Sequence, residues 1–430
     1  MNETFDDVAC TVCGCVCDDL RITTDGKRIV SAERACELAK PWFAAQRSDL
    51  PRAAEINGRS TSLDAALDHA AELLRQAKSP LIYGLSRSTT EGQRAAVALA
   101  ERIGATIDTT AATGHAQSLM ALQQVGESTC TLGEIKNRAD LVIYWGSDPL
   151  TTHPRHLERY SVEPRGFAIP NGRQDRTLIV ADAQPTITSS VADEFIAIRP
   201  GEDWEAFWAL RAMVRGQSLP SDANVGADRQ QLERLAERMK SAKCGVIFFG
   251  VALTRGGLGH RTVAAMLELV NDLNRFTRFY ARRMRRLGDV AGADSVLTWQ
   301  TGYPFGVNFA AGYPRYNPGE FSAPEMLARG EIDACLFVGS ETALEFPVEA
   351  QARLRQIPII TLDSPGVKPF IPPTVRFTTA VYGVHRPGTA YRMDEVPIPL
   401  RVLLPTSLPS DGEILTALRD RLPFSTIQAS

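Results

Sequence analysis

Short apolar runs alternate with longer amphipathic segments along most of this chain, and this alternation restricts the fold more than any other feature. The runs PLIYGL (80–85) and LVIYWG (141–146) have the length and the β-branched and aromatic content of buried strands. The segments 62–78 and 92–104 repeat apolar residues at the spacing of an amphipathic helix. Strands that alternate with helices in this way favour parallel sheets covered by helices.

The same rhythm continues and then begins again near Leu232. We expect further strands at 176–182, 243–250, 333–340 and 358–363, and further helices at 204–216 and 260–274. The sequence therefore predicts an α/β protein with two open parallel-sheet units flanked by helices.

Changes in composition divide the chain into four successive segments. We expect a small cysteine-containing module at 1–58, a first α/β unit at 59–230, a second at 231–367 and a proline-rich C-terminal segment at 368–430. Proline lacks the backbone N–H that a central strand donates. The last segment, which includes FIPPTVRFTT and PIPLRVLLP, is therefore expected to wrap the surface or dock on a neighbour without adding a central strand.

The first forty residues differ from the remainder in their cysteines. Cys10, Cys13 and Cys17 form a C-x2-C-x3-C run, Cys36 follows after eighteen intervening residues, and Cys15 is a fifth thiol in the same region. Four thiolates at such spacings can hold a [4Fe–4S] cluster. A zinc site also takes four cysteines, although usually as two close pairs, and a site that has lost its metal is the third interpretation.

The segment after the cysteine run predicts a small β-hairpin. Residues 19–32 alternate apolar and polar side chains about Asp25-Gly26, a dipeptide that suits a two-residue type I′ turn. The start MNETFDD has neither a basic n-region nor an apolar h-region, so no secretory signal is visible. We therefore expect a cytoplasmic protein, in which disulfides are rare.

Composition excludes several classes of protein. The chain has 430 residues, of which 44% are hydrophobic and 23% are charged, and this composition predicts a globular protein. Its net charge of −3 gives no basic footprint for nucleic acid. It has no apolar run near the roughly 18 residues that a membrane-spanning helix needs. We therefore expect neither nucleic acid nor membrane as a partner.

Polar side chains follow the predicted strands at the edge where open parallel sheets bind ligands. These residues are Asp148, His153, Arg155, His156 and Arg159 after 141–146, and Asp182 after 176–182. The basic cluster suits a phosphate or carboxylate, and a packed cluster beneath a loop is the alternative. The glycine-rich loop 255–259 has neither Walker nor G-x-G-x-x-G spacing, so it does not predict ATP or NAD.

Several long strings of this chain resemble the B subunit of tungsten- or molybdenum-dependent formylmethanofuran dehydrogenases. They are the N-terminal cysteines, TLGEIKNRAD with the following LVIYWGSDPLTTHPRHLERYS (131–161), TWQTGYPFGVNFAAGYPRYNPGEF (298–321) and HRPGTAYRMDEVP (385–397). The resemblance runs from Cys10 to Leu400 and implies a molybdopterin-oxidoreductase-like fold. For redox-active members, the resemblance implies one iron–sulfur cluster and a bis-pterin tungsten or molybdenum centre that reduces carbon dioxide to formate.

The chain departs from this family at the metal ligand. The family's cysteine or selenocysteine lies in a string resembling V-C-H-G-P-S, and here Gly114 occupies that position, followed by His115. A second string resembling M-R-G-H-Y-N-V aligns so that Arg285 persists while Leu287 replaces a histidine. Gly114, His115 and Arg285 would then line a vestigial pocket without catalytic function, because glycine offers no side chain to a metal.

A run of arginines lies beside this second string. Under the resemblance, Arg282, Arg283, Arg285 and Arg286 would suit pterin phosphates. The alternative is that the run faces water or the acids of a partner subunit, as charge runs usually do.

A bacterial relative of the dehydrogenase fits these departures. The chain resembles the B subunit of the formyltransferase/hydrolase complex, which works with tetrahydromethanopterin and a methanofuran-like carrier in the formaldehyde oxidation of methylotrophs. This implies a structural subunit without tungsten or molybdenum pterin, partnered by the A, C and D subunits, with Cys10, Cys13, Cys17 and Cys36 as the place for a [4Fe–4S] cluster or an empty site. The alternatives are an active tungsten or molybdenum dehydrogenase subunit and an independent small-molecule-binding protein.

Overall fold

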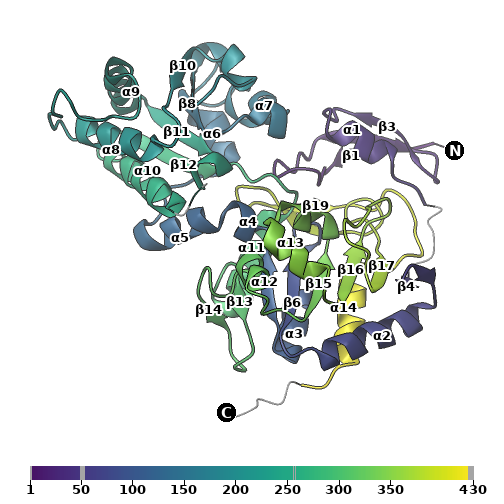
Figure 1. The fold of residues 1–430 in the computed structure, drawn as a ribbon. Helices are drawn as coiled ribbons and strands as arrows, with labels where there is room; N and C mark the ends of the chain where they lie inside the picture. Colours follow the sequence, from purple (N-terminus) through teal and green to yellow (C-terminus); the bar gives the residue numbers. More distant parts are fainter. Residues whose placement is uncertain (1, 49–53, 255, 257, 425–430) are drawn as a thin grey trace. The chain divides into compact units, whose positions relative to one another are not determined.

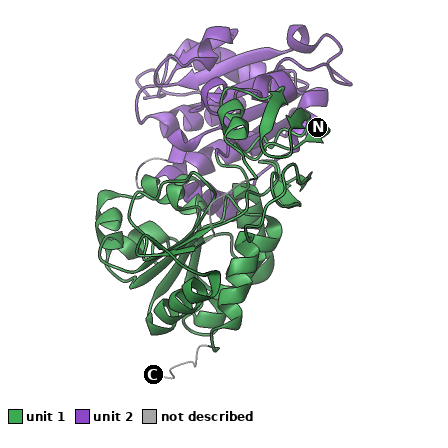
Figure 2. Cartoon of the chain, turned by 90° about the vertical axis from the view of Figure 1, so that its right-hand side faces the viewer, with its two compact units in different colours: residues 1–114, 287–430 green, residues 115–286 purple. Residues whose placement is uncertain are grey.

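The computed structural model describes residues 2–48, 54–254, 256 and 258–424 (Figure 1). The chain forms two compact units, one made of residues 1–114 and 287–430 and the other of residues 115–286 (Figure 2). The second unit is thus inserted into the first. The structure does not follow the successive boundaries at 58/59, 230/231 and 367/368, because strands from both of the expected α/β segments enter one sheet.

The main sheet of the first unit contains nine strands among the described residues. Their order is β14 (Arg315–Tyr316), β13 (Val307–Asn308), β7 (Thr106–Thr109), β6 (Pro80–Gly84), β15 (Ala334–Val338), β16 (Ile359–Asp363), β17 (Val375–Thr378), β4 (Ala54–Ile56) and β5 (Arg59–Ser60). The five strands from β7 to β17 are parallel. Leu81 pairs with Cys335, so β6 lies beside a strand that follows it by about 250 residues.

Helices pack against this sheet and bury its apolar faces. They are α2 (Leu63–Gln76), α3 (Thr90–Ile103), α4 (Ala111–Gly114), α11 (Val290–Thr301), α12 (Ala323–Ala328), α13 (Val348–Leu354) and α14 (Asp411–Asp420). The expected helix at 62–78 begins at Ser62, whose hydroxyl accepts the backbone N–H of Ala65 at 3.2 Å. Such a cap satisfies one of the amides that a helix start leaves unpaired.

The C-terminal segment does add a central strand, so that expectation is wrong. Pro372 and Pro373 precede β17, which leaves its own N–H groups available, and β17 pairs with both β16 and β4. The segment continues through the antiparallel pair β18 (Gly388–Tyr391) and β19 (Pro397–Leu400). It ends in α14, which packs on α3 and begins with a capping box between Ser410 and Glu413.

The second unit holds a five-stranded parallel sheet among its described residues. The order is β10 (Glu194–Ala197), β9 (Thr177–Asp182), β8 (Leu141–Trp145), β11 (Cys244–Phe249) and β12 (Arg278–Arg283). Its helices are α5 (Ala116–Val125), α6 (Leu132–Arg138), α7 (Pro149–Thr152), α8 (Asp203–Val214), α9 (Arg229–Ser241) and α10 (Gly259–Leu273). The predicted α/β class with parallel sheets is confirmed.

A three-stranded antiparallel sheet forms the N-terminal region. It consists of β1 (Glu3–Val8), β2 (Leu20–Thr24) and β3 (Ile29–Glu33), followed by α1 (Ala39–Ala44). The hairpin turn is longer than the two residues expected, because Thr24 pairs with Ile29 and residues 25–28 form the loop. The Asp25 carboxylate accepts the N–H groups of Lys27 and Arg28, both at 2.9 Å, and thereby favours this four-residue loop.

Shorter helical turns complete the structure, at Leu157–Ser161, Gly172–Asp175, Thr188–Val191, Val251–Thr254 and Ser340–Glu345. Among the described residues, no helix combines the length and the apolar composition needed to cross a membrane.

Candidate functional site

The cysteine run forms a loop between β1 and β2. The backbone N–H of Cys10 donates to the carbonyl of Cys17 at 2.8 Å, and that of Val16 donates to the carbonyl of Cys13 at 3.1 Å. Cys10, Cys13 and Cys17 are buried, as is Cys15, whereas Cys36 is half-buried and lies just before α1. The fold therefore encloses the thiols of the run.

Electrostatic interactions show that these thiols are neighbours. Burial raises the pKa of the Cys10 thiol, and negative charge on Cys13, Cys17 or Cys36 raises it further. The pKa of Cys13 is lowered by the S–H of Cys15, which donates to it, and by the Arg87 guanidinium. In the described part of the chain, no three His, Cys, Asp or Glu side chains are arranged to hold a metal ion.

This donor set fits an iron–sulfur cluster in its chemistry. Thiolates are the usual ligands of such clusters, and the four ligands surround several iron atoms instead of meeting at one ion. That Cys10, Cys13, Cys17 and Cys36 hold a [4Fe–4S] cluster stays a prediction.

The cysteine loop is fixed by residues of its own unit. Cys13 forms an isolated antiparallel bridge with Leu287. The next residue, Gly288, lies so close to the loop that a Cβ there would be 2.2 Å from the carbonyl oxygen of Thr11. Arg87 donates to the carbonyls of Thr11 and Val12 at 3.3 and 3.2 Å. Leu287 thus contacts the cysteine loop through its backbone.

Gly114 is the last residue of α4, the short helix that follows β7. The end of β7 is held by the carboxylate of Asp108, which accepts the N–H groups of Thr109, Gly306 and Ala323 at 2.7–2.8 Å. Burial raises the pKa of Asp108 to about 8, although these three hydrogen bonds lower it. The strand end that leads into α4, the helix that ends at Gly114, is therefore tightly anchored.

His115 and Arg285 are brought together in the second unit. Both side chains are buried. Burial, together with the positive charges of Arg285 and Arg283, holds the pKa of His115 well below its usual value. His115 is therefore neutral at pH 7.

His153 belongs to the same neighbourhood. Its Nε2 lies 2.8 Å from the carbonyl oxygen of Arg285, and its Nδ1 lies 2.8 Å from the hydroxyl of Thr152. Burial lowers the pKa of His153 to about 4. A neutral imidazole that donates from Nε2 and accepts at Nδ1 satisfies both contacts.

The arginine run differs from the expectation that it faces water. Arg282, Arg283 and Arg285 are buried, and only Arg286 is exposed. Arg283 forms an ion pair of 3.0 Å with Glu127, in which both side chains are buried. Arg282 and Arg283 lie at the end of β12, where they contact Thr129 and Glu127 of the loop that follows α5.

The basic cluster after β8 is mostly a packed cluster. His156 is fully buried, and its Nδ1 lies 2.8 Å from the hydroxyl of Tyr144, which in turn lies 2.7 Å from the hydroxyl of Ser161. Arg155 forms an ion pair of 2.7 Å with Glu158. These contacts favour the packing interpretation over phosphate recognition.

A cavity of about 340 Å³ opens at the carboxyl ends of the second unit's strands. It is lined by Gly146 and Asp148 after β8, Asp182 at the end of β9, Gly250 after β11 and Arg286 after β12. The sheet order changes direction between β8 and β11, which is where open α/β sheets bind ligands. Asp148 and Asp182 were expected here from the sequence. Gly250 was not expected as a site residue, although its position directly after an apolar run could have indicated it.

No family model matches the chain, but whole-length relatives do. The B subunit of tungsten-containing formylmethanofuran dehydrogenase 2 from Methanocaldococcus jannaschii is 42% identical over 434 residues, covering 97% of this chain and 98% of the relative. The chain belongs to the family of formylmethanofuran dehydrogenase B subunits. The resemblance recognised in the sequence is thereby confirmed.

Two further relatives are less similar to this chain. The protein of the same name from Methanococcus maripaludis is 37% identical over 425 residues and covers 97% of this chain. The B subunit of the formyltransferase/hydrolase complex Fhc from Methylorubrum extorquens is 30% identical over 289 residues, covering 67% of this chain and 75% of the relative.

Solved structures agree with this assignment. The crystal structure of the formyltransferase/hydrolase complex FhcABCD from Methylorubrum extorquens, in complex with methylofuran, contains a chain that matches with a TM-score of 0.69 and 26% identity. The match covers 86% of this chain and 98% of that one. Acetylene hydratase from Pelobacter acetylenicus matches with a TM-score of 0.66 and 13% identity, which shows a shared fold alone.

Proposed function

We propose that this chain is the B subunit of a formyltransferase/hydrolase complex in tetrahydromethanopterin- and methanofuran-linked oxidation of formaldehyde to formate. It is a structural subunit without redox catalysis, and it assembles with the A, C and D subunits of that complex. The observation that carries the proposal is Gly114, which under the family resemblance aligns with the thiolate that binds the metal in redox-active members.

The residues present do not fit a tungsten or molybdenum centre anchored by the protein. Glycine has no donor atom, and the cysteines outside the N-terminal run lie elsewhere in the fold. Cys244 is buried within β11 and Cys335 within β15, while Cys130 follows Gly114 by sixteen residues. Next to Gly114 in the chain, His115 is kept neutral by burial and two arginines, which does not suit a proton donor at pH 7.

The N-terminal cysteines do fit a cluster. Cys10, Cys13, Cys17 and Cys36 would hold it, and a bound [4Fe–4S] cluster exchanges single electrons. Contacts within the chain also hold this loop in place, because Arg87 donates to the carbonyls of the loop and Gly288 packs against Thr11. Retention of the cysteine loop is therefore compatible with a structural subunit.

The second candidate is an active tungsten or molybdenum formylmethanofuran dehydrogenase subunit. The similarity to its relatives favours it, since the two dehydrogenase relatives are 42% and 37% identical over 97% of this chain, whereas the Fhc relative is 30% identical over 67% of it. The two candidates differ in what the loaded protein contains: a metal pterin in the dehydrogenase, and none in the structural subunit.

Quantification of tungsten, molybdenum, zinc and iron in the purified complex tests the proposal. We expect no stoichiometric tungsten or molybdenum and no pterin, together with formate release from a formylated carrier. Gly114→Cys serves as the matched variant and should not restore carbon dioxide reduction. Stoichiometric tungsten or molybdenum with pterin in the wild-type complex would establish the dehydrogenase instead.

A further inference from the structure

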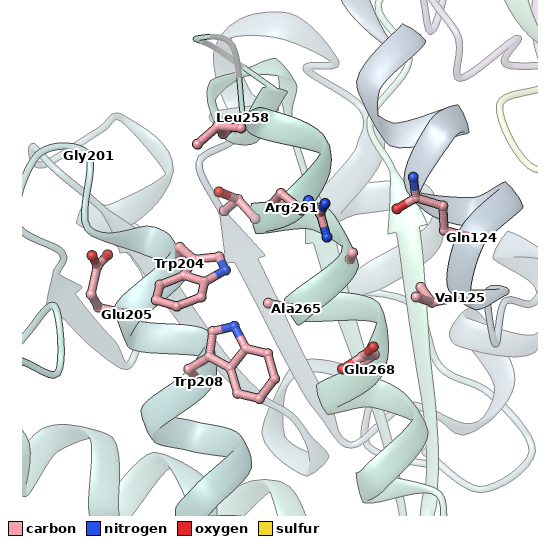
Figure 3. A pocket seen from close by; sticks show the side chains of 12 residues that line it. Gln124, Val125, Gly201, Trp204, Glu205, Trp208, Leu258, Arg261, Ala265 and Glu268 are labelled. Carbon is pink, nitrogen blue, oxygen red and sulfur yellow. The ribbon is translucent and has the colours of Figure 1, made fainter.

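A groove of about 660 Å³ runs over α10 in the second unit (Figure 3). The small side chains of Ala264 and Ala265 on α10 form part of its floor. One wall is α8 and the other is the end of α5, because both helices pack against α10. The groove is therefore made entirely from the outer surfaces of helices and the loops beside them.

Two tryptophans dominate the α8 wall. Trp204 and Trp208 lie one helical turn apart and point toward α10 (Figure 3). Their exposed fractions are 44% and 42%, and Leu258 at the start of α10 is 70% exposed. Val125 at the end of α5 adds apolar surface on the opposite wall. Exposed tryptophan beside exposed aliphatic surface is typical of protein interfaces and of their energetically dominant residues.

A positive charge lies on the same surface. Arg261, Ala265 and Glu268 share one face of α10 (Figure 3). Glu268 is already paired with Arg211, whose guanidinium lies 4.2 Å from the ring centre of Trp208. Within the described part of the chain, no carboxylate lies at ion-pair distance from Arg261. The groove thus combines apolar side chains with one cation, Arg261, and with the carboxylate of Glu205 on the α8 wall.

The dimensions and surroundings of the groove favour a helix as the occupant. Its floor from Leu258 to Glu268 is about 15 Å long, or about three helical turns. The groove offers no free strand edge, so β-strand addition is not available there. Small-molecule pockets bury most of their ligand, whereas Trp204 and Trp208 form an open wall.

We propose that this groove is the docking site for an amphipathic helix of a partner subunit, with apolar side chains on Trp204 and Trp208 and a carboxylate paired with Arg261. This inference rests on the proposed function, because it requires a multisubunit complex. The solved structure that this chain matches over 98% of the neighbour's length is itself a complex of several subunits. The partner is therefore a subunit that carries an amphipathic helix with one carboxylate placed opposite Arg261.

Photo-cross-linking in the assembled complex tests the docking site directly. The photoreactive residue p-benzoylphenylalanine replaces Leu258, and the matched control carries it at Phe167, an 84% exposed position of the same unit. We expect Leu258 to cross-link to a helical peptide of a partner subunit and Phe167 to yield no such adduct. A cross-link to a second copy of this chain, or no adduct from Leu258, overturns the inference.

Affinity measurements provide the second test. Trp204→Glu combined with Trp208→Glu should weaken binding of that partner about 30-fold or more, the scale of an interface hot spot. Arg261→Glu should also weaken it, whereas Arg261→Lys keeps the charge and most of the affinity. If the wild-type chain assembles and both tests fail, only the docking inference falls. If the chain does not associate with formyltransferase and hydrolase subunits at all, the proposed function falls with it.

Discussion

Lowering the pH from 7 to 5 is expected to destabilise the second unit through His153, and the substitution His153→Gln should remove this effect. His153 is fully buried between the carbonyl of Arg285 and the hydroxyl of Thr152, and both contacts suit the neutral ring. A glutamine amide can still donate to the Arg285 carbonyl but does not titrate in this range. The variant therefore separates the effect of charge from the effect of packing.

The sign and size of the effect follow from the two pKa values of His153. Its pKa is about 4 in the folded protein and has an ordinary value of 6.5 in the unfolded chain. Between these values the unfolded chain binds a proton that the folded protein does not, so stability is full above pH 6.5 and falls as the pH falls toward 4. Between pH 7 and pH 5 the loss amounts to about 2 kcal/mol.

Urea unfolding at pH 7 and pH 5, followed by tryptophan fluorescence, to which the buried Trp145 of the same unit contributes, measures this difference. The wild-type protein should lose about 2 kcal/mol more between the two pH values than His153→Gln does. His69→Gln, on the half-exposed surface of α2, is the control and should behave like the wild type. Equal pH dependence in the wild type and in His153→Gln would refute the reasoning.

Three further outcomes follow from the site. Gly288→Ala places a methyl group against the Thr11 carbonyl, so thermal unfolding should show a loss of about 1–3 kcal/mol and faster labelling of the cysteine loop by a thiol reagent. His115→Ala and Arg285→Ala should leave formate release by the assembled complex nearly unchanged, whereas a hundredfold fall would identify an active site. Glu127→Gln removes the carboxylate that forms a buried ion pair with Arg283 and should cost about 3–5 kcal/mol in urea unfolding, while an unchanged midpoint would contradict that pairing.

The strands and helices of this fold were largely predictable because their apolar periodicity is strong. The run at 141–146 forms β8, since it is short and rich in β-branched and aromatic residues, and the segment 62–78 contains α2, since it is long and has helical spacing. The C-terminal segment was misjudged because proline forbids a strand only where its own N–H is needed. Pro372 and Pro373 lie before β17, and sequence alone does not show where that strand begins.

The candidate site was predictable only in part. Cys10, Cys13, Cys17 and Cys36 are recognisable by type and spacing, and Gly114 by its place in a family string. The burial of Arg283 was not predictable, because its partner Glu127 lies in another part of the chain. Periodicity describes neighbours along the chain, whereas this pair depends on tertiary packing.

The insertion of one unit into the other has a consequence during synthesis. β6 cannot pair with its parallel partner β15 until β15 has been translated, about 250 residues later. At ~5–20 residues per second, this delay is roughly 10–50 s, during which the edge of β6 stays unpaired on the ribosome while residues 115–286 are complete enough to fold. The early strands of the first unit are therefore the part of the nascent chain that most needs a chaperone.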